Sequence, residues 1–181
     1  MKVRLGVDDW VGAAFELMAD EGIAGVKLHR LCERLGVTKG SFYWHFADLD
    51  AFLGEVARQW RDGAGVVRID VTEVLVAGDP RASLRRLLDL YVDRDLGRLE
   101  RAMRDWARTD PRAREAVARA DARALDAMTA GFLSLGLTQD EADVRAKLLF
   151  YAAVGYGDVG PIGSGGLVDH QVDILVDLLV R

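Results

Sequence analysis

The chain has 181 residues, of which half are hydrophobic and 29% are charged, so it has enough apolar material for a sizeable core and is not disordered by composition. Its net charge of −5 argues against a protein that binds nucleic acid over its whole surface, although a local basic patch remains compatible with it. The chain contains only three prolines, which favours long helices.

The single cysteine, Cys32, excludes a disulfide framework within the chain and suits a reducing compartment. The first ten residues contain basic side chains but no apolar segment of a signal peptide. No run of 18 apolar residues occurs. We therefore expect a cytoplasmic protein that does not associate with a membrane.

Residues 8–62 contain four apolar stripes at helical spacing. The first follows Asp8, a suitable N-cap, and two glycines mark its end. A short second stripe over 28–35 ends at Gly36, and a third helix is expected from about Thr38 to Trp44. The fourth, over 49–60, has Asp48 in the N-cap position.

Residues 63–78 alternate apolar and polar side chains in part, which is a strand period. A lone strand would have no partner here, so we expect the end of a helix and a connector instead. A helix start follows at Asp79-Pro80, with apolar residues at helical offsets from Leu84 to Tyr91.

Three further helices are predicted after a stripe over 96–106. Asp110-Pro111 begins a long helix that Gly136 ends, and Thr138 with Glu141 forms a capping box for the next one. A loop is expected over 157–166, followed by a last helix. The chain is thus predicted to be all-α, with about nine helices, no internal repeat and no low-complexity segment.

Residues 28–46, LHRLCERLGVTKGSFYWHF, have the pattern of a helix-turn-helix. Gly36 allows the left-handed backbone of a tight turn, and Val37 is the apolar residue between the two helices. Thr38 is expected to cap the second helix and to leave its amide-rich end open to a phosphate oxygen.

The second helix of this pair separates its side chains by face. Phe42 and Phe46 are expected to point inward, and Gly40 lets the backbone approach a partner closely. Donor-rich and flat side chains, which suit phosphates and base edges, remain outside: Thr38, Lys39, Ser41, Tyr43, Trp44 and His45. Residues 27–47 carry a local net charge of +3 before histidines are counted.

With these residues the stretch closely resembles the DNA-binding signature of the TetR (tetracycline-repressor-like) family of transcriptional regulators, over residues 8 to about 62. Two later stretches, 99–125 and 136–155, resemble the ligand domain of one branch of that family. The resemblance implies a three-helix DNA-binding head over 1–47 and a helical ligand-binding and dimerisation body over 48–181, in which the helix of 48–62 connects the two.

The resemblance also implies that Thr38–Trp44 is the recognition helix. The expected DNA contacts are Lys27, Thr38, Lys39, Gly40, Ser41, Tyr43, Trp44 and His45. The family usually has a lysine at the start of the fourth helix, where this chain has Leu49 between Asp48 and Asp50, so no contact is carried over to Leu49. Lys27 stands where a threonine is common and is a candidate phosphate contact.

Aromatic residues and methionine in the body are either plain core or the lining of an effector pocket. As a group, the candidate pocket residues are Trp60, Tyr91, Met103, Trp106, Phe132, Phe150 and Tyr151. In the last two helices, the stripes Ala142–Ala146–Leu149–Ala153 and Val168–Val172–Leu175–Leu179 are either core or, as we prefer, the seam of a symmetric homodimer.

The sequence therefore predicts a homodimeric, ligand-responsive regulator, in the first instance a repressor, that binds a palindromic operator in double-stranded DNA and an unknown small-molecule effector. We expect no enzyme activity, cofactor or metal, because no nucleophile–base pair, nucleotide loop or ligand cluster occurs. The rival hypothesis is a helical small-molecule-binding protein or enzyme whose helix-turn-helix no longer binds DNA. The acidic residues beside Leu49 favour that rival.

Overall fold

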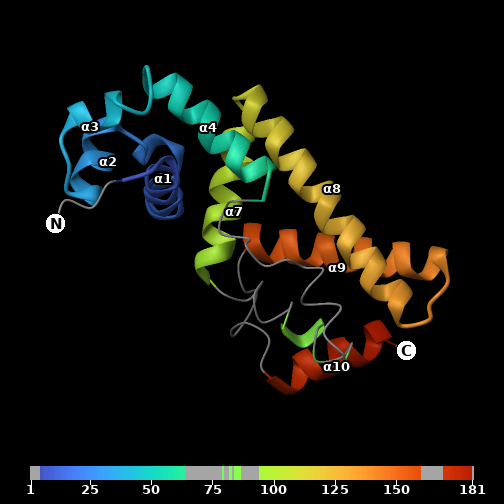
Figure 1. Ribbon diagram of the computed structural model, residues 1–181. Coiled ribbons are helices and arrows are strands. Elements are labelled where there is room, and N and C mark those ends of the chain that lie inside the picture. Colours follow the sequence, from blue (N-terminus) through green and yellow to red (C-terminus); the bar gives the residue numbers. More distant parts are fainter. Residues whose placement is uncertain are drawn as a thin grey trace. The chain divides into compact units, whose positions relative to one another are not determined.

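The structure, a computed structural model, describes residues 5–63, 79, 82, 84–86, 94–159 and 169–180 (Figure 1). Across these ranges the regular elements are all helices, which confirms the predicted fold class. No helix within them is long and apolar enough to cross a membrane.

The first three α-helices and one 3₁₀ turn form a compact head. Their order is α1 (Val7–Glu21), the turn η1 (Ile23–Gly25), α2 (Leu28–Leu35) and α3 (Lys39–Tyr43). Gly22, which ends α1, has a positive φ of 69° and donates its amide to the Met18 carbonyl at 2.8 Å. This left-handed backbone is accessible to glycine at little cost, so the chain can reverse at once into η1.

Five further helices with described bounds follow the head. These are α4 (Leu49–Arg61), α7 (Arg94–Ala107), α8 (Pro111–Ser134), α9 (Gln139–Val159) and α10 (Asp169–Val180). The start of α9 confirms the predicted capping box, because the Glu141 carboxylate accepts from the Thr138 amide at 3.0 Å. The predicted N-cap of α4 is also confirmed, since Asp48 accepts from the Ala51 amide at 2.7 Å.

Two predicted boundaries are wrong. Gly6, not Asp8, is the N-cap of α1, and the Gly6 amide donates to the Asp9 carboxylate at 2.7 Å. The predicted loop over 157–166 begins too early, because α9 continues through Gly157 to Val159. The predicted connector over 63–78 lies almost entirely outside the described residues, as do Leu87, Leu88, Tyr91 and Val168.

The chain divides into two compact units, each with its own core. Unit 1 contains the described residues up to 63 together with Arg98–Ala120. Its core joins the head to α4, to most of α7 and to the start of α8, and its members include Trp10, Phe42, Phe52, Trp60, Met103, Trp106 and Ala113. The core of unit 1 is therefore built from two distant stretches of sequence.

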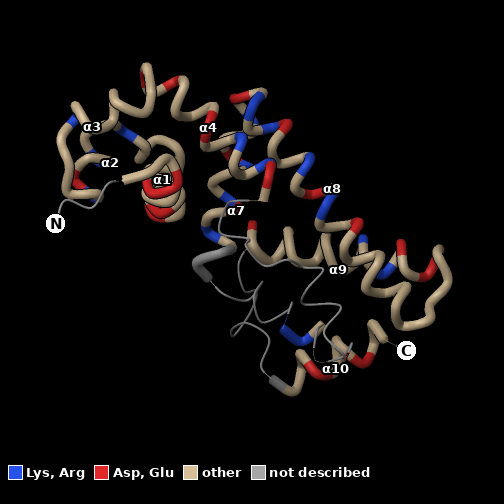
Figure 2. Tube along the Cα trace, in the orientation of Figure 1, with Lys and Arg blue, Asp and Glu red and all other residues tan. Residues whose placement is uncertain are grey.

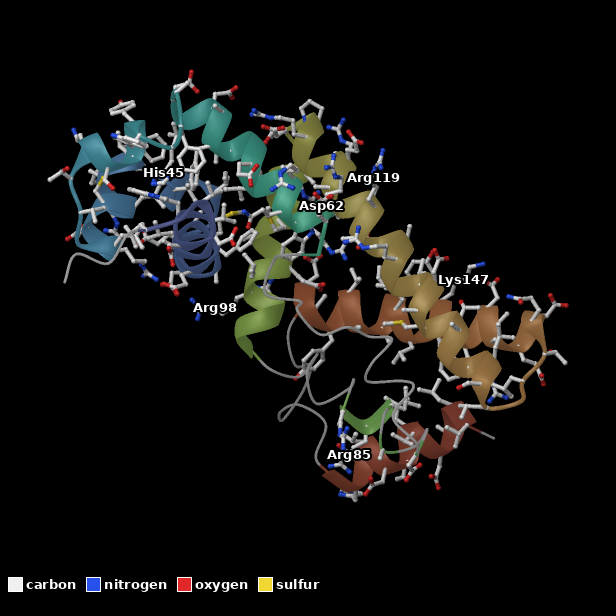
Figure 3. The ribbon with its side chains drawn as sticks, viewed as in Figure 1. His45, Asp62, Arg85, Arg98, Arg119 and Lys147 are labelled. Carbon is white, nitrogen blue, oxygen red and sulfur yellow. The ribbon has the colours of Figure 1, made fainter. Side chains whose placement is uncertain are left out.

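Unit 2 contains the second part of α8 together with α9, α10 and the described residues around Leu84. Its core consists of Leu84, Met128, Phe132, Ala142, Ala146, Leu149, Phe150, Val172, Val176 and Leu179. Two polar contacts reinforce the packing. Arg145 of α9 donates to the Leu179 carbonyl of α10 at 2.6 Å, and Arg85 (Figure 3) forms an ion pair with Asp173.

Candidate DNA-binding site

The turn between α2 and α3 has the backbone that its sequence predicts. Gly36 is left-handed, with φ 64° and ψ 34°, and its amide lies 3.2 Å from the Glu33 carbonyl. Val37 donates to the Cys32 carbonyl at 3.0 Å, and its side chain packs partly buried against the core. The turn thus joins the helices in one fixed geometry, as a helix-turn-helix requires.

An aromatic cluster under α3 supports it from the inside. Phe42 is fully buried, and the centroid of its ring lies 5.3 Å from that of Trp10 and 5.5 Å from that of Phe52, both edge to face. Phe46 packs on Phe52 with a centroid separation of 4.8 Å. Edge-to-face aromatic pairs add stabilisation beyond the buried area, so α3 rests on a rigid base.

Cys32, on the inner side of α2, belongs to the same core. Burial raises the pKa of the Cys32 thiol, and the nearby Lys39 charge opposes this effect only in part. A raised pKa keeps the thiol protonated at neutral pH and therefore unreactive.

Most of the side chains predicted to contact DNA lie on α3 or directly beside its ends. Tyr43 is 58% and Trp44 82% exposed, and Lys27, Thr38, Lys39 and Gly40 are also exposed. Ser41 and His45 are half-buried, and the His45 ring leans on Trp10 with centroids 6.5 Å apart. Thr38 is the N-cap residue of α3, but its hydroxyl makes no capping hydrogen bond, which leaves that hydroxyl available.

The charge around this surface is weaker than a count of residues suggests. Arg34 on α2 donates to Glu16 at 2.8 Å and to Asp20 at 3.1 Å, both on the acidic side of α1 (Figure 2), and Arg30 pairs with Glu21. The hydrogen bond that Arg34 donates to the Glu16 carboxylate is the main reason why the pKa of Arg34 is raised. These carboxylates neutralise two of the four basic side chains of the segment.

Lys27 and Lys39 are the other two basic side chains of this segment. Neither forms an ion pair with any residue that the structure describes. They lie at the start of α2 and at the start of α3, respectively. The positive charge available to a DNA phosphate is therefore concentrated at the N-terminal ends of the two helices.

The start of α4 explains how the chain accommodates a leucine between two aspartates. Leu49 packs partly buried against the core of unit 1. The Asp48 carboxylate caps α4, and the Asp50 carboxylate lies 2.9 Å from a guanidinium nitrogen of Arg112. Both acidic groups at this helix start therefore have a partner.

The candidate effector residues do not gather in one described cluster. Trp60, Met103 and Trp106 lie in the core of unit 1, whereas Phe132 and Phe150 lie in the core of unit 2. Tyr151 is 65% exposed on α9, and Tyr91 lies outside the described residues. In the part of the chain that the structure describes, no three histidine, cysteine or acidic side chains gather in a group that could hold a metal ion.

Comparison with known proteins agrees with this geometry. Residues 11–56 match the model of the family described as "Bacterial regulatory proteins, tetR family". This N-terminal segment of the chain is therefore similar to the DNA-binding part of TetR-family regulators. The matched residues run from the core of α1 through the helix-turn-helix to the middle of α4, which is the segment that presents α3.

Two curated proteins are similar to part of this chain. The HTH-type transcriptional regulator AcrR of Shigella flexneri is 28% identical over 75 residues, which cover 41% of this chain and 34% of AcrR. The class C tetracycline repressor protein of Escherichia coli is 43% identical over 47 residues, or 26% of this chain and 22% of the repressor. The chain thus spans about a third or less of the length of these relatives.

Solved structures share the fold over nearly the whole chain. A transcriptional regulator from Rhodococcus sp. Rha1 has a TM-score of 0.71 at 23% identity and covers 97% of this chain and 96% of its own. A protein from Saccharomonospora viridis, solved in complex with choline, has a TM-score of 0.73 at 23% identity. The similarity covers 96% of this chain and 94% of that protein. At these identities the similarity concerns the fold.

Arg112 is a residue at this site that sequence reasoning missed. It lies 62 residues from its partner Asp50, and no pattern in a single sequence connects the two. Arg112 follows the Asp110-Pro111 pair at the start of α8, but that pattern predicts only the beginning of a helix.

Proposed function

We propose that this protein is a ligand-responsive, sequence-specific DNA-binding transcriptional regulator, and a repressor in the first instance. The observation that carries the proposal is the presentation of α3. Phe42 on its inner side is fully buried, whereas Lys39, Tyr43 and Trp44 on or beside the helix are exposed. Residues 11–56, which include this helix, match the TetR-family model. A helix held in this way can enter the major groove and place side chains against base edges.

The proposed role of each DNA-facing residue follows from its chemistry. Lys27, Thr38 and His45 would bind phosphates from the helix ends and fix the register of the head. Lys39 and Ser41 would contact bases or phosphates, and Gly40 would allow close approach. The flat exposed rings of Tyr43 and Trp44 would pack on sugars or on thymine methyl groups, while the Tyr43 hydroxyl would donate to a phosphate.

We propose a homodimer through α9 and α10, but with a seam different from the predicted stripes. Those stripes are core: Ala142, Ala146 and Leu149 are 0%, 0% and 3% exposed, and Val172 and Leu179 are each 4% exposed. The two helices expose other apolar side chains at helical spacing, namely Val144, Leu148, Tyr151 and Val159 on α9 and Ile174 and Leu178 on α10. Large exposed apolar groups on neighbouring helices favour burial against a second copy.

A dimer of this kind would place two α3 helices about one turn of DNA apart, roughly 34–36 Å, and so bind a palindrome. An effector that binds one head spacing better than the other would shift the DNA affinity. The choline bound to the Saccharomonospora viridis protein supports a small organic effector, because that protein shares this fold. A thermal-shift screen with small amphipathic metabolites would identify the effector.

The proposal is tested by selection from a random DNA library, with the segment upstream of the protein's own gene included, followed by titrations at several salt concentrations. We expect enrichment of a palindrome and a linear fall of log affinity with log salt. If Lys27 and Lys39 are the cationic phosphate contacts, a dimer makes about four, and the slope is roughly −3 to −4. A flat salt response, or no enriched sequence, would favour the rival hypothesis that the head no longer binds DNA.

A further inference from the structure

Arg112, the second residue of α8, bridges two carboxylates from different parts of unit 1. Its Nη2 lies 2.9 Å from Asp50 Oδ1 and 2.8 Å from Asp110 Oδ2. Its Nη1 donates to the Asp50 main-chain carbonyl at 3.1 Å, and its Nε donates to Asp110 Oδ1 at 3.2 Å. The guanidinium therefore binds both the side chain and the backbone of Asp50, which requires the planar fork of an arginine.

Asp110 holds this guanidinium from the other side. Its side chain is only 15% exposed, and its Oδ1 accepts the Arg112 backbone amide at 2.8 Å. The hydrogen bond from the Arg112 side chain is the largest cause of the lowered pKa of Asp110. Because Asp110 fixes the main chain and the side chain of the same arginine, the direction of the guanidinium towards α4 is set by the corner between α7 and α8.

The residue that Arg112 holds lies next to the base of the recognition helix. Asp50 is in the first turn of α4, two residues before Phe52. Phe52 is fully buried, and its ring lies 5.5 Å from that of Phe42 and 4.8 Å from that of Phe46. A shift of the first turn of α4 would therefore move the aromatic base on which α3 rests.

We infer that Arg112 is a positioning residue for DNA recognition, which by clamping Asp50 fixes the first turn of α4 and through Phe52 the orientation of α3. The inference rests on the proposed function, because it assigns a role in DNA binding to a residue outside the DNA-facing surface. Asp50 is 79% and Arg112 38% exposed, and exposed ion pairs add little to global stability. The clamp is thus expected to act on orientation more than on unfolding.

The test compares Arg112→Gln and Arg112→Lys with Arg119→Gln. Arg119 also lies on α8, but its side chain is 62% exposed (Figure 3) and pairs with Glu115 of the same helix at 3.0 Å. Arg112→Gln and Arg119→Gln remove the same charge from the same helix, and only the first breaks the link to α4. Arg112→Lys retains the charge but cannot bind the Asp50 carbonyl and carboxylate as a fork.

Two readouts are needed, hydrogen exchange of the free protein and affinity for the selected DNA. Loss of charge-assisted hydrogen bonds should raise exchange at the amides of residues 51–54 by about tenfold and weaken DNA binding by a similar factor in both Arg112 variants. Arg119→Gln should leave both quantities within about twofold of wild type. The melting temperatures of all three variants should stay close to that of the wild-type protein.

Wild-type exchange and affinity in Arg112→Lys would show that charge alone suffices and would overturn the inference. Unchanged exchange in Arg112→Gln would overturn it as well. If the wild-type protein selects no DNA at all, the proposed function fails, and with it the DNA role of Arg112. Normal binding by the wild type and by all variants refutes the positioning role alone.

Discussion

Tyr43 and Phe42 are adjacent in the chain but have opposite surroundings. Tyr43 is 58% exposed and its ring contacts that of Phe42 edge to face, at 5.6 Å between centroids, whereas Phe42 is fully buried. Substitutions at these two positions can therefore separate recognition of DNA from stability of the head.

Tyr43→Ala is expected to weaken binding to the selected DNA by about tenfold, because it removes a phosphate donor and a flat contact surface. Helix content and dimer mass should not change. Phe42→Ala, the neighbouring control, should instead lower the free energy of unfolding by about 3–5 kcal/mol. Tyr43→Phe removes only the hydroxyl group, so its DNA affinity in the same titration separates the contribution of the hydroxyl from that of the ring. Wild-type affinity in Tyr43→Ala would remove this residue from the interface.

Asp110 gives the stability of the protein a pH dependence. Its pKa lies below the ordinary 3.8 because Arg112 and backbone amides donate to its ionised form. A lowered pKa in the folded state contributes stability that is present above the ordinary value and is lost as the pH falls through the folded value.

Asp110→Asn should therefore be less stable than wild type at pH 7, and the difference should shrink as the pH falls below about 4. Urea unfolding over a series of pH values measures it. Asp105→Asn is the control, since that side chain is 61% exposed and pairs with Arg108 only at 3.4 Å. If the difference in free energy of unfolding between wild type and Asp110→Asn does not change with pH, ionisation of Asp110 does not stabilise the fold.

At the scale of single elements, two glycines of the head have contrasting surroundings. Gly12 lies in the middle of α1, and a Cβ added there would meet nothing within 4 Å. Gly25 is buried in η1, and its Cβ would lie 2.6 Å from the Glu21 Cβ and 3.4 Å from the Leu17 carbonyl oxygen. The first glycine weakens its helix, whereas the second allows a close contact.

Gly12→Ala is accordingly expected to raise the free energy of unfolding by about 0.5–1 kcal/mol. Gly25→Ala should lower it by about 1–3 kcal/mol, because the backbone must move to admit the methyl group. Thermal and urea unfolding of the two variants side by side measure both effects. Equal changes in the free energy of unfolding of the two variants would mean that the packing around η1 does not require a glycine at position 25.

Helix ends show which elements the sequence can predict. The sequence predicts Asp48 and the pair Thr138 and Glu141 correctly, because each lies directly before the first residues of its apolar stripe. The prediction of Asp8 is wrong, because Asp9 beside it reaches back to the Gly6 amide and shifts the start of α1. Similarly, the apolar face of α9 was recognised, but periodicity cannot tell whether Ala142 and Ala146 pack within the chain or against a copy.

At the scale of the whole molecule, contacts between distant segments determine the net charge beside the proposed DNA contacts. The helical hairpin pattern, its inward phenylalanines and its exposed donors could be predicted from residues 28–46 alone, since they depend on local spacing. The neutralisation of Arg34 by Glu16 and Asp20 could not, because it depends on how α2 crosses α1. The bridge from Arg112 to Asp50 was hidden for the same reason.

The proposed dimer leads to a prediction for α9. Leu148 is 61% exposed, so Leu148→Glu should leave the fold intact and place a charge in the seam. Light scattering at micromolar concentration should give half the mass of wild type, and affinity for the palindrome should fall at least tenfold. Ala122→Glu, at an exposed position of α8, is the control and should remain dimeric. A dimeric Leu148→Glu would place the seam elsewhere.

The shared core of unit 1 has a consequence for building hybrid regulators. Trp60 and Val56 on α4 are buried together with Met103 and Trp106 of α7 and with Ala113 of α8. A graft that takes only the residues before 63 would leave those aromatic and aliphatic surfaces bare and the carbonyl of Asp50 without its arginine. The unit that would carry the proposed DNA binding is therefore discontinuous in sequence, and a transplant must include Arg98–Ala120 together with the head.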